Sequence, residues 1–249
     1  MFKRIVVFFV TLLWCGAAFG AHPLVTDDAG TQGAGKFQLE LSGEYAKDGG
    51  DSTTETAAAV AGGIRDDLDL MLSVPYQFLR SRDDEGNRVT EDGISDAALE
   101  LKWRFYETEH CSLALKPGIT FPTGDKDKGL GDGKAGYGAV FIATGDIEPV
   151  TLHLNLGFMK NREELRDVWH YSIAAEYELK KDLLAVGNLG GETNSDRGLN
   201  THPAFILVGL IYTLNESLSV DIGIKAGLNN AEPDYAVLAG LAVVLGGDE

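Results

Sequence analysis

Apolar and polar residues alternate along the chain in runs of about ten residues, the length of a strand that crosses an outer membrane. In the clearest run, Phe37, Leu39 and Leu41 alternate with Gln38 and Glu40. Successive side chains of a β-strand point to opposite faces, so this run predicts a strand with one apolar and one polar face. No stretch after residue 20 comes near the roughly 18 consecutive apolar residues of a transmembrane helix. The pattern therefore favours an all-β fold.

Twelve such runs are predicted as strands. They are Lys36–Lys47, Thr53–Ile64, Leu68–Phe78, Ala97–Phe105, Leu113–Phe121, Tyr137–Thr144, Val150–Phe158, Trp169–Leu179, Leu183–Glu192, Ala204–Tyr212, Leu218–Leu228 and Tyr235–Leu245. An even number is what a single-chain bacterial barrel requires. Some of the runs are apolar on both faces, most plainly at 183–190 and 204–210, which predicts an apolar stripe on the lumen wall near the tenth strand.

The connections between the runs alternate in length. Short links lie at 65–67, 107–110, 145–149, 180–182 and 215–216, and longer polar links lie at 46–52, 80–93, 123–136, 160–167, 193–202 and 229–234. Bacterial barrels have short periplasmic turns and longer outer loops. We therefore predict a closed antiparallel transmembrane β-barrel of about twelve strands, with both termini in the periplasm.

Aromatic residues cluster near the ends of the predicted strands. The outer set is Tyr45, Tyr76, Phe78, Phe158, Trp169 and Tyr235, and the inner set is Trp103, Phe105, Tyr106, Tyr177 and Tyr212. Aromatic rings prefer the two membrane interfaces, where they form girdles. The alternative is a soluble β-sandwich or barrel with an aromatic core, which alternation alone does not exclude.

The first twenty residues have the pattern of a signal peptide. Lys3 and Arg4 precede the apolar stretch Ile5–Trp14, and Ala18-Phe19-Gly20 supplies small residues for a cleavage site. The stretch is shorter than the roughly 20 apolar residues of a membrane anchor. We predict a cleaved signal peptide at 1–20, a periplasmic N-terminal segment at 21–35 that is a candidate plug for the lumen, and an outer-membrane barrel at 36–249.

Charge and cysteine content exclude other classes. The chain carries 38 acidic and 21 basic residues, for a net charge of −17, and has no basic stripe. Nucleic acid is therefore not an expected partner, because phosphates need cationic contacts. Cleavage of the signal peptide would leave Cys111 alone, so no intramolecular disulfide could form. A closed ring of strand hydrogen bonds is another way to hold such a fold.

Candidate residues for catalysis or metal binding have weak support. The sequence lacks a Gly-x-Ser-x-Gly motif, and Cys111 has no neighbouring histidine. Asp125, Asp127 and Asp132 lie in a glycine-rich link, but their spacing matches no calcium-binding loop, and a solvated outer loop is the better interpretation. We predict no catalytic residue, no metal and no cofactor.

Two further groups of residues have alternative interpretations. His153 and His170 face inward on neighbouring predicted strands and could serve a serine–histidine esterase, although polar lining of the lumen is the simpler account. His22, Asp27 and Asp28 near the mature start could bind a metal or plug the lumen from below, or act as turn residues.

Strand parity places a set of charged residues on the inward faces. The candidate lumen and constriction residues are Glu40, Glu44, Asp69, Glu100, Lys102, Arg104, Lys116, His153, His170, Glu176, Glu178, Asp221 and Lys225. The mixed signs predict salt bridges across the lumen, because unpaired charges are costly in a narrow, partly dry channel. Such a cluster could filter solutes, or it could only fill and stiffen the barrel.

Three stretches resemble the MetA-pathway of phenol degradation family, whose members are described as outer-membrane transporters. They are the mature start from His22 to Gly33, leading into Gly35–Glu40; Gly93–Asp96 followed by Leu99–Phe105; and Pro117–Asp125 followed by Gly129–Gly131. The resemblance covers essentially the whole mature chain. The C-terminus departs from the usual pattern of barrels, since it ends Gly246-Gly247-Asp248-Glu249 rather than on an aromatic residue. The resemblance implies the fold and the location more than the solute.

Together, the patterns and the resemblance predict an outer-membrane barrel that passes small molecules, including aromatic or amphipathic compounds. The alternative is a non-conducting structural or adhesive barrel whose function lies in its outer loops. Expected partners are outer-membrane lipid, a small-molecule solute and, during biogenesis, the barrel assembly machinery.

Overall fold

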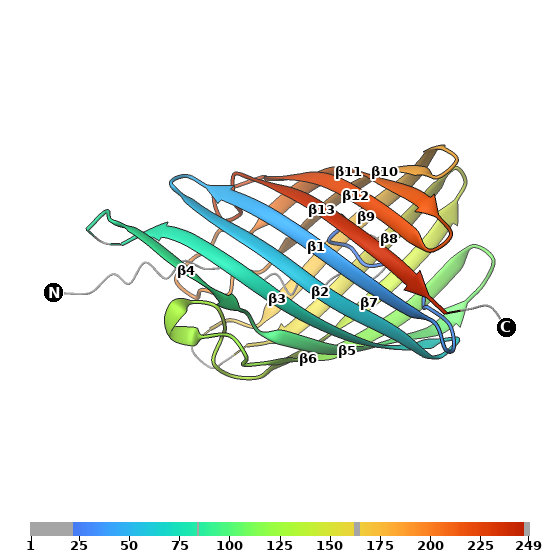
Figure 1. Cartoon of the computed structure of the whole chain (residues 1–249), viewed down its shortest axis with the longest axis horizontal. Coiled ribbons are helices and arrows are strands. Elements are labelled where there is room, and N and C mark those ends of the chain that lie inside the picture. The colour runs from blue at the N-terminus through green and yellow to red at the C-terminus, as the bar shows by residue number, and fades with distance from the viewer. Residues whose placement is uncertain (1–21, 84, 162–164, 247–249) are drawn as a thin grey trace.

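The wall of the protein is a single antiparallel sheet that closes on itself (Figure 1). The computed structural model describes residues 22–83, 85–161 and 165–246, so the expected signal peptide lies outside the described residues. The strands are β1 (Phe37–Asp48), β2 (Asp51–Arg65), β3 (Leu68–Arg82), β4 (Arg88–Ile94), β5 (Ala97–Glu107), β6 (Cys111–Phe121), β7 (Gly136–Ile147), β8 (Val150–Lys160), β9 (Val168–Lys180), β10 (Leu183–Glu192), β11 (Ala204–Asn215), β12 (Leu218–Gly227) and β13 (Tyr235–Leu245).

Closure joins the beginning and the end of the chain. Strand β1 pairs with β13 from Phe37↔Leu245 to Lys47↔Tyr235, and the pairing of β2 with β3 completes the ring. Strand β3 pairs with both β4 and β5 along different parts of its length, so these two strands share one position in the wall. The barrel therefore has twelve strand positions, as the sequence predicts.

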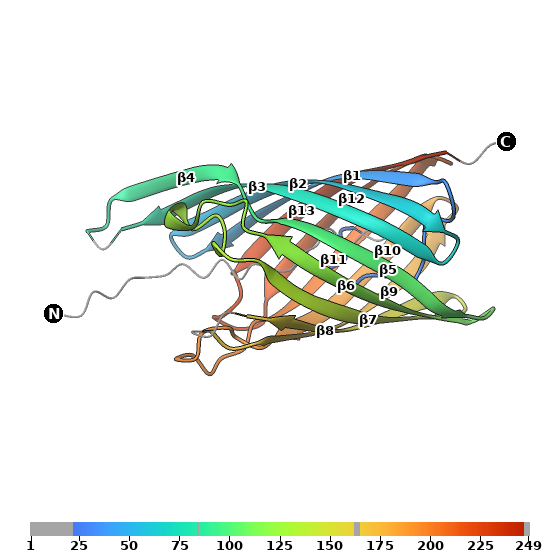
Figure 2. The same cartoon turned by 90° about the horizontal axis from the view of Figure 1, so that it is seen from below.

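The outer link at 80–93 was predicted wrongly. Instead of a loop, the end of β3 and all of β4 form a hairpin, paired from Tyr76↔Ile94 to Arg82↔Arg88. Figures 1 and 2 show this hairpin extending beyond the rest of the wall. Residues 88–94 have no face that is consistently apolar, so the alternation that marks the other strands is missing there.

The wall is apolar outside and polar inside. On β8, Leu154 is 47 % exposed, whereas its neighbours His153 and Asn155 are each 3 % exposed. On the apolar faces of other strands, Leu70, Ile173 and Ile222 are exposed in the same way, and Leu39 and Leu101 are half-buried. A soluble barrel would show the reverse arrangement, so the soluble alternative is excluded.

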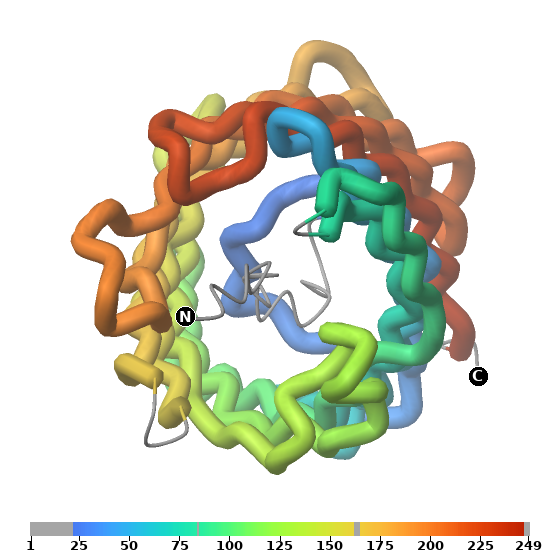
Figure 3. Tube along the Cα trace, turned by 90° about the vertical axis from the view of Figure 1, so that its left-hand side faces the viewer, coloured from blue at the N-terminus to red at the C-terminus, as the bar shows by residue number. Residues whose placement is uncertain are grey.

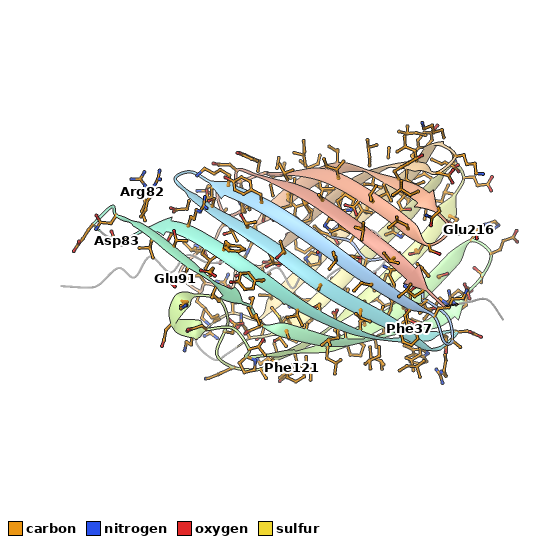
Figure 4. All side chains as sticks on the ribbon, in the orientation of Figure 1. Phe37, Arg82, Asp83, Glu91, Phe121 and Glu216 are labelled. Carbon is orange, nitrogen blue, oxygen red and sulfur yellow. The ribbon has the colours of Figure 1, made fainter. Side chains whose placement is uncertain are left out.

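Exposed aromatic side chains lie near both rims of the barrel. Trp169 and Tyr235 lie at the end that carries the longer loops, and Trp103 and Tyr106 lie at the end with the short turns. Figure 4 locates the two ends, with Arg82 and Asp83 at the first and Glu216 at the second. No helix in the described part of the chain is long and apolar enough to cross a membrane.

An outer loop is fastened to the wall at the break between β4 and β5. The Asp96 carboxylate accepts hydrogen bonds from the backbone N–H groups of Gly124 and Asp132, both at 2.8 Å. The Ser95 hydroxyl donates to the carbonyl of Leu130 at 2.6 Å, and the Leu130 side chain is buried. A Cβ atom on Gly131 would collide with the Asp96 carboxylate, which explains the need for glycine there.

Candidate functional site

The interior of the barrel holds a segment of the chain itself. Figure 3 looks along the barrel and shows the start of the described chain, in blue, inside the ring of strands. Residues 22–35 contact side chains from opposite parts of the wall. Their polar contacts on the strands are Asp221 (β12), Asn188 (β10), Ser172 (β9), Asn155 (β8), Thr144 (β7), Lys116 (β6), Lys102 (β5), Asp69 (β3) and Gln38 (β1). The segment therefore lies across the lumen.

A buried ion cluster fixes the middle of this segment. Asp27 lies between Lys102 and Lys116, which occupy the middle of β5 and β6, and each ammonium nitrogen is 2.8 Å from one of its carboxylate oxygens. Lys116 also pairs with Glu100 at 3.4 Å. Burial would raise the pKa of Asp27, but the two ammonium groups outweigh burial and hold this pKa below its usual range. The charges compensate one another, as buried charges must.

An asparagine side chain fixes the start of the segment. Asn188 Oδ1 accepts from the backbone N–H groups of Val25 at 2.7 Å and Thr26 at 3.0 Å. Further along the segment, the Asn155 amide donates to the carbonyl of Asp27 at 3.2 Å. An irregular backbone inside a barrel needs such partners, because it has no ladder of its own.

Both ends of the segment are held by carboxylates of the wall. His22 Nδ1 lies 2.5 Å from a carboxylate oxygen of Asp221. At the other end, the backbone N–H of Gln32 donates to Asp69 at 2.9 Å. These contacts give roles to two of the acidic residues that strand parity places inward.

The apolar stripe expected near the tenth strand is present. Val186, Phe205, Leu207 and Leu238 form a buried cluster on neighbouring strands, and Leu24 of the N-terminal segment packs into it. The packing removes apolar surface from water, at about 25 cal/mol per Å². The stripe therefore serves as a contact for the segment.

A second charged group lies nearer the outer loops. Lys225 pairs with Glu44 at 3.2 Å and with Glu232 at 3.3 Å, and its ammonium group lies 5.7 Å from the centre of the Phe205 ring. Nearer the short turns, His153 of β8 lies 3.5 Å from Glu176 of β9. Glu40 is buried, and its Oε1 atom has no hydrogen-bond partner among the described residues.

Two predicted lumen residues lie elsewhere. Arg104 pairs with Glu107 at 2.9 Å and donates to the carbonyl of Asp66 in a short turn, so it is not part of the cluster around Asp27. Glu178 is exposed, close to the end of β9.

The inward side of β7–β10 borders a cavity with about 420 Å³ of empty space, part of which is open solvent. Its lining includes Val25 of the segment, the apolar residues Met159 and Val168, and two titratable residues, His170 and Glu192. Glu192 was not among the predicted lumen residues, because its strand is apolar on both faces and parity does not indicate which face points inward. His170 was predicted to face inward, but its partner was not predicted.

Comparison with known proteins identifies the family of this chain. Residues 23–245 match the family described as "Putative MetA-pathway of phenol degradation". The chain belongs to this family. No curated protein sequence matches that of this family member.

Solved structures share the fold of this MetA-pathway family member. An outer-membrane channel from Pseudomonas putida F1 superposes with a TM-score of 0.68 and 13 % identity, covering 88 % of this chain and 98 % of the channel. The NanC porin gives a TM-score of 0.61 at 11 % identity, with 82 % and 98 % covered. The KdgM porin gives 0.58 at 7 % identity, with 83 % and 98 % covered. At these identities the comparison establishes the barrel fold.

Proposed function

We propose that the protein is an outer-membrane channel that passes small molecules, and that residues 22–35 narrow its lumen. One observation carries this proposal. The side chains of the wall do not fill the interior alone, and a separate stretch of chain, held largely by hydrogen bonds and ion pairs, occupies part of it. A barrel with a purely structural role needs no such segment, because wall side chains can fill a narrow lumen.

The structural relatives support the proposal. The matched structures include a channel and porins, and the family name refers to degradation of phenol. The cavity beside β7–β10 combines apolar walls with a few polar groups, as sites for small molecules do. We therefore propose aromatic or amphipathic compounds as solutes, and a transport role rather than catalysis. The Ser172 hydroxyl, beside His170, already accepts a hydrogen bond from Thr26 and is buried, which does not favour a role as nucleophile.

The route to the membrane is part of the proposal. The residues before 21 are a cleaved signal peptide, the exposed apolar wall contacts outer-membrane lipid, and the barrel assembly machinery inserts the chain. Mass spectrometry of protein extracted from outer membranes would measure the mature N-terminus. A start near residue 21 supports the proposed export route, and an intact N-terminus opposes it.

The decisive experiment is conductance in planar bilayers. The wild type and a deletion of residues 22–34 are reconstituted separately. We expect small discrete openings for the wild type and larger openings for the deletion, because the deletion removes the obstruction. If neither protein conducts while both are folded, the channel proposal is wrong.

Uptake by cells tests the choice of solute. Cells with and without the protein are given a phenol or a sugar of similar size. Loss of phenol uptake alone supports an aromatic solute, whereas loss of sugar uptake alone indicates a general pore.

The hairpin of β3 and β4 favours a second candidate function. It extends beyond the wall and presents polar residues such as Arg82 and Asp83 at its tip (Figure 4). A non-conducting barrel could use this hairpin as an adhesive surface. Deletion of residues 81–89 would then abolish attachment to a surface and leave conductance unchanged.

A further inference from the structure

A directed chain of hydrogen bonds leads from the N-terminal segment to His170. Asn188 Oδ1 accepts from two backbone N–H groups, so its Nδ2 atom is fixed as a donor and bonds to Thr26 Oγ1 at 2.7 Å. The Thr26 hydroxyl then donates to Ser172 Oγ at 2.7 Å. The hydroxyl proton of Ser172 is not used in the contact with Thr26 and can be donated to His170 Nε2, which lies 3.1 Å away.

A hydrogen bond donated by Ser172 to Nε2 selects one tautomer of His170. A neutral imidazole whose Nε2 accepts a hydrogen bond carries its proton on Nδ1. In this tautomer His170 presents an N–H donor on the side of the ring that faces Glu192.

Glu192 stands opposite His170 across the pairing of β9 and β10. Its carboxylate is 4.0 Å from His170 Nδ1, beyond the roughly 2.7–3.2 Å of a direct hydrogen bond. Glu192 is 8 % exposed, and both side chains line the cavity. The cavity therefore offers one donor and one acceptor, too far apart to satisfy each other.

We propose that the cavity binds a neutral solute through a hydroxyl group placed between His170 and Glu192. The solute hydroxyl accepts a hydrogen bond from Nδ1 of His170 and donates one to a carboxyl oxygen of Glu192. The apolar body of the solute lies against Val140, Met159 and Val168. This inference rests on the proposed channel function, because it makes the cavity a station along the solute's path.

The groups around the cavity disfavour solutes that carry a carboxylate, an amine or an ether in place of the hydroxyl group. A solute carboxylate would meet two acidic side chains, because Glu232 is close enough to Glu192 to act on it. A protonated amine can donate to Glu192 but has no lone pair to accept from His170, and Lys116 adds a positive charge that acts on the same ring. An ether can accept from His170 but cannot donate to Glu192.

Binding to the purified full-length mature protein tests the inference without relying on transport. The probes share a phenyl ring: 2-phenylethanol, its methyl ether, phenylacetate and phenethylamine. Affinities are measured by ligand-observed NMR in lipid nanodiscs, with empty nanodiscs subtracted. A tenfold difference in affinity corresponds to about 1.4 kcal/mol, the size of one buried hydrogen bond. We expect the alcohol to bind about tenfold more tightly than the other probes.

Two variants locate the interaction. Glu192→Leu should lower the affinity for the alcohol to that of the ether and leave the ether unaffected. Thr26→Val interrupts the hydrogen-bond chain without removing a cavity wall, so it should also weaken the alcohol selectively, which identifies Thr26 as a positioning residue. Glu178→Leu, the same chemical change on the neighbouring strand, is the matched control.

The ligand series in the wild type decides the outcome even if a variant fails to fold. Equal affinity for alcohol and ether overturns the inference, as does tightest binding of the acid or the amine. Flux of the four probes into liposomes separates this result from the proposed function. Flux of all four probes without preference would support the channel and contradict the hydroxyl site. Hydroxyl-selective binding without flux would contradict the channel and support the hydroxyl site.

Discussion

Lys102 donates a hydrogen bond to Asp27 over 2.8 Å, and both side chains are almost completely buried in the lumen. The pair connects the middle of a wall strand to the segment that crosses the interior. Removing one partner of a buried pair costs about 3–5 kcal/mol, because the other charge stays behind. The pair is therefore the point at which a single substitution should loosen the segment most.

Asp27→Asn should increase single-channel conductance severalfold. The substitution leaves Lys102 and Lys116 facing each other without the charge between them, so the segment is released from this part of the wall. Asp125→Asn, in an outer loop, is the control and should conduct like the wild type. Unchanged conductance in Asp27→Asn, with the protein folded, would mean that the segment does not limit flow.

Lys116→Ala should change ion selectivity more than Arg104→Ala. Sequence parity gives both residues the same inward side, but only Lys116 joins the cluster around Asp27, whereas Arg104 pairs with Glu107 beside a short turn. Reversal potentials across a salt gradient measure the difference. An equal shift for both variants would contradict the placement of the narrow region at Lys116.

Ile173→Arg should destabilise the barrel by about 2–4 kcal/mol, because an arginine would face lipid near the middle of β9. Urea unfolding in lipid vesicles measures the free energy. Glu178→Arg, near the end of the same strand, should cost far less. Similar costs for the two variants would argue against a membrane-spanning wall.

Asp96→Ala should expose the outer loop at 123–136 to proteolysis. Its carboxylate accepts from the backbone N–H groups of Gly124 and Asp132, so the substitution removes both contacts at once. Limited digestion of intact cells measures the change. Asp92→Ala, on the projecting hairpin, removes the hydrogen bond to Tyr76 and should leave that loop protected.

Strand positions were predictable because lipid and water impose opposite demands on the two faces of each strand. Leu183–Glu192 and Tyr235–Leu245 have the predicted bounds, and most other strands are longer than predicted by a few residues. The pattern fails for β4, which lies in the projecting hairpin (Figure 1) and has no consistently apolar face. Residues 22–35 have no periodic pattern of apolar and polar residues. The sequence therefore indicates a candidate plug without indicating which wall residues it contacts.

The pairing of His170 with Glu192 depends on a local irregularity. The register of β9 and β10 shifts between Leu183 and Leu184, from Leu183↔Lys180 to Leu184↔Glu178. Without this shift Glu192 would stand opposite Tyr171, and a slip of one residue moves side chains to the other face. Nothing in the sequence of the short turn at 180–182 indicates this shift in register, so the pairing of His170 with Glu192 could not be predicted.

Closure of the wall by β1 and β13 imposes an order on assembly. Phe37 pairs with Leu245, and the segment that precedes β1 lies inside the ring that this pairing seals. Residues 22–35 cannot pass sideways through a sealed sheet. They must be enclosed as the last strand arrives, or threaded lengthwise through an open end afterwards. If they are enclosed, their contacts with β8, β9 and β10 form while the sheet is still open. The N-terminal segment then acts as a template around which the strands curve before β1 and β13 pair and close the barrel.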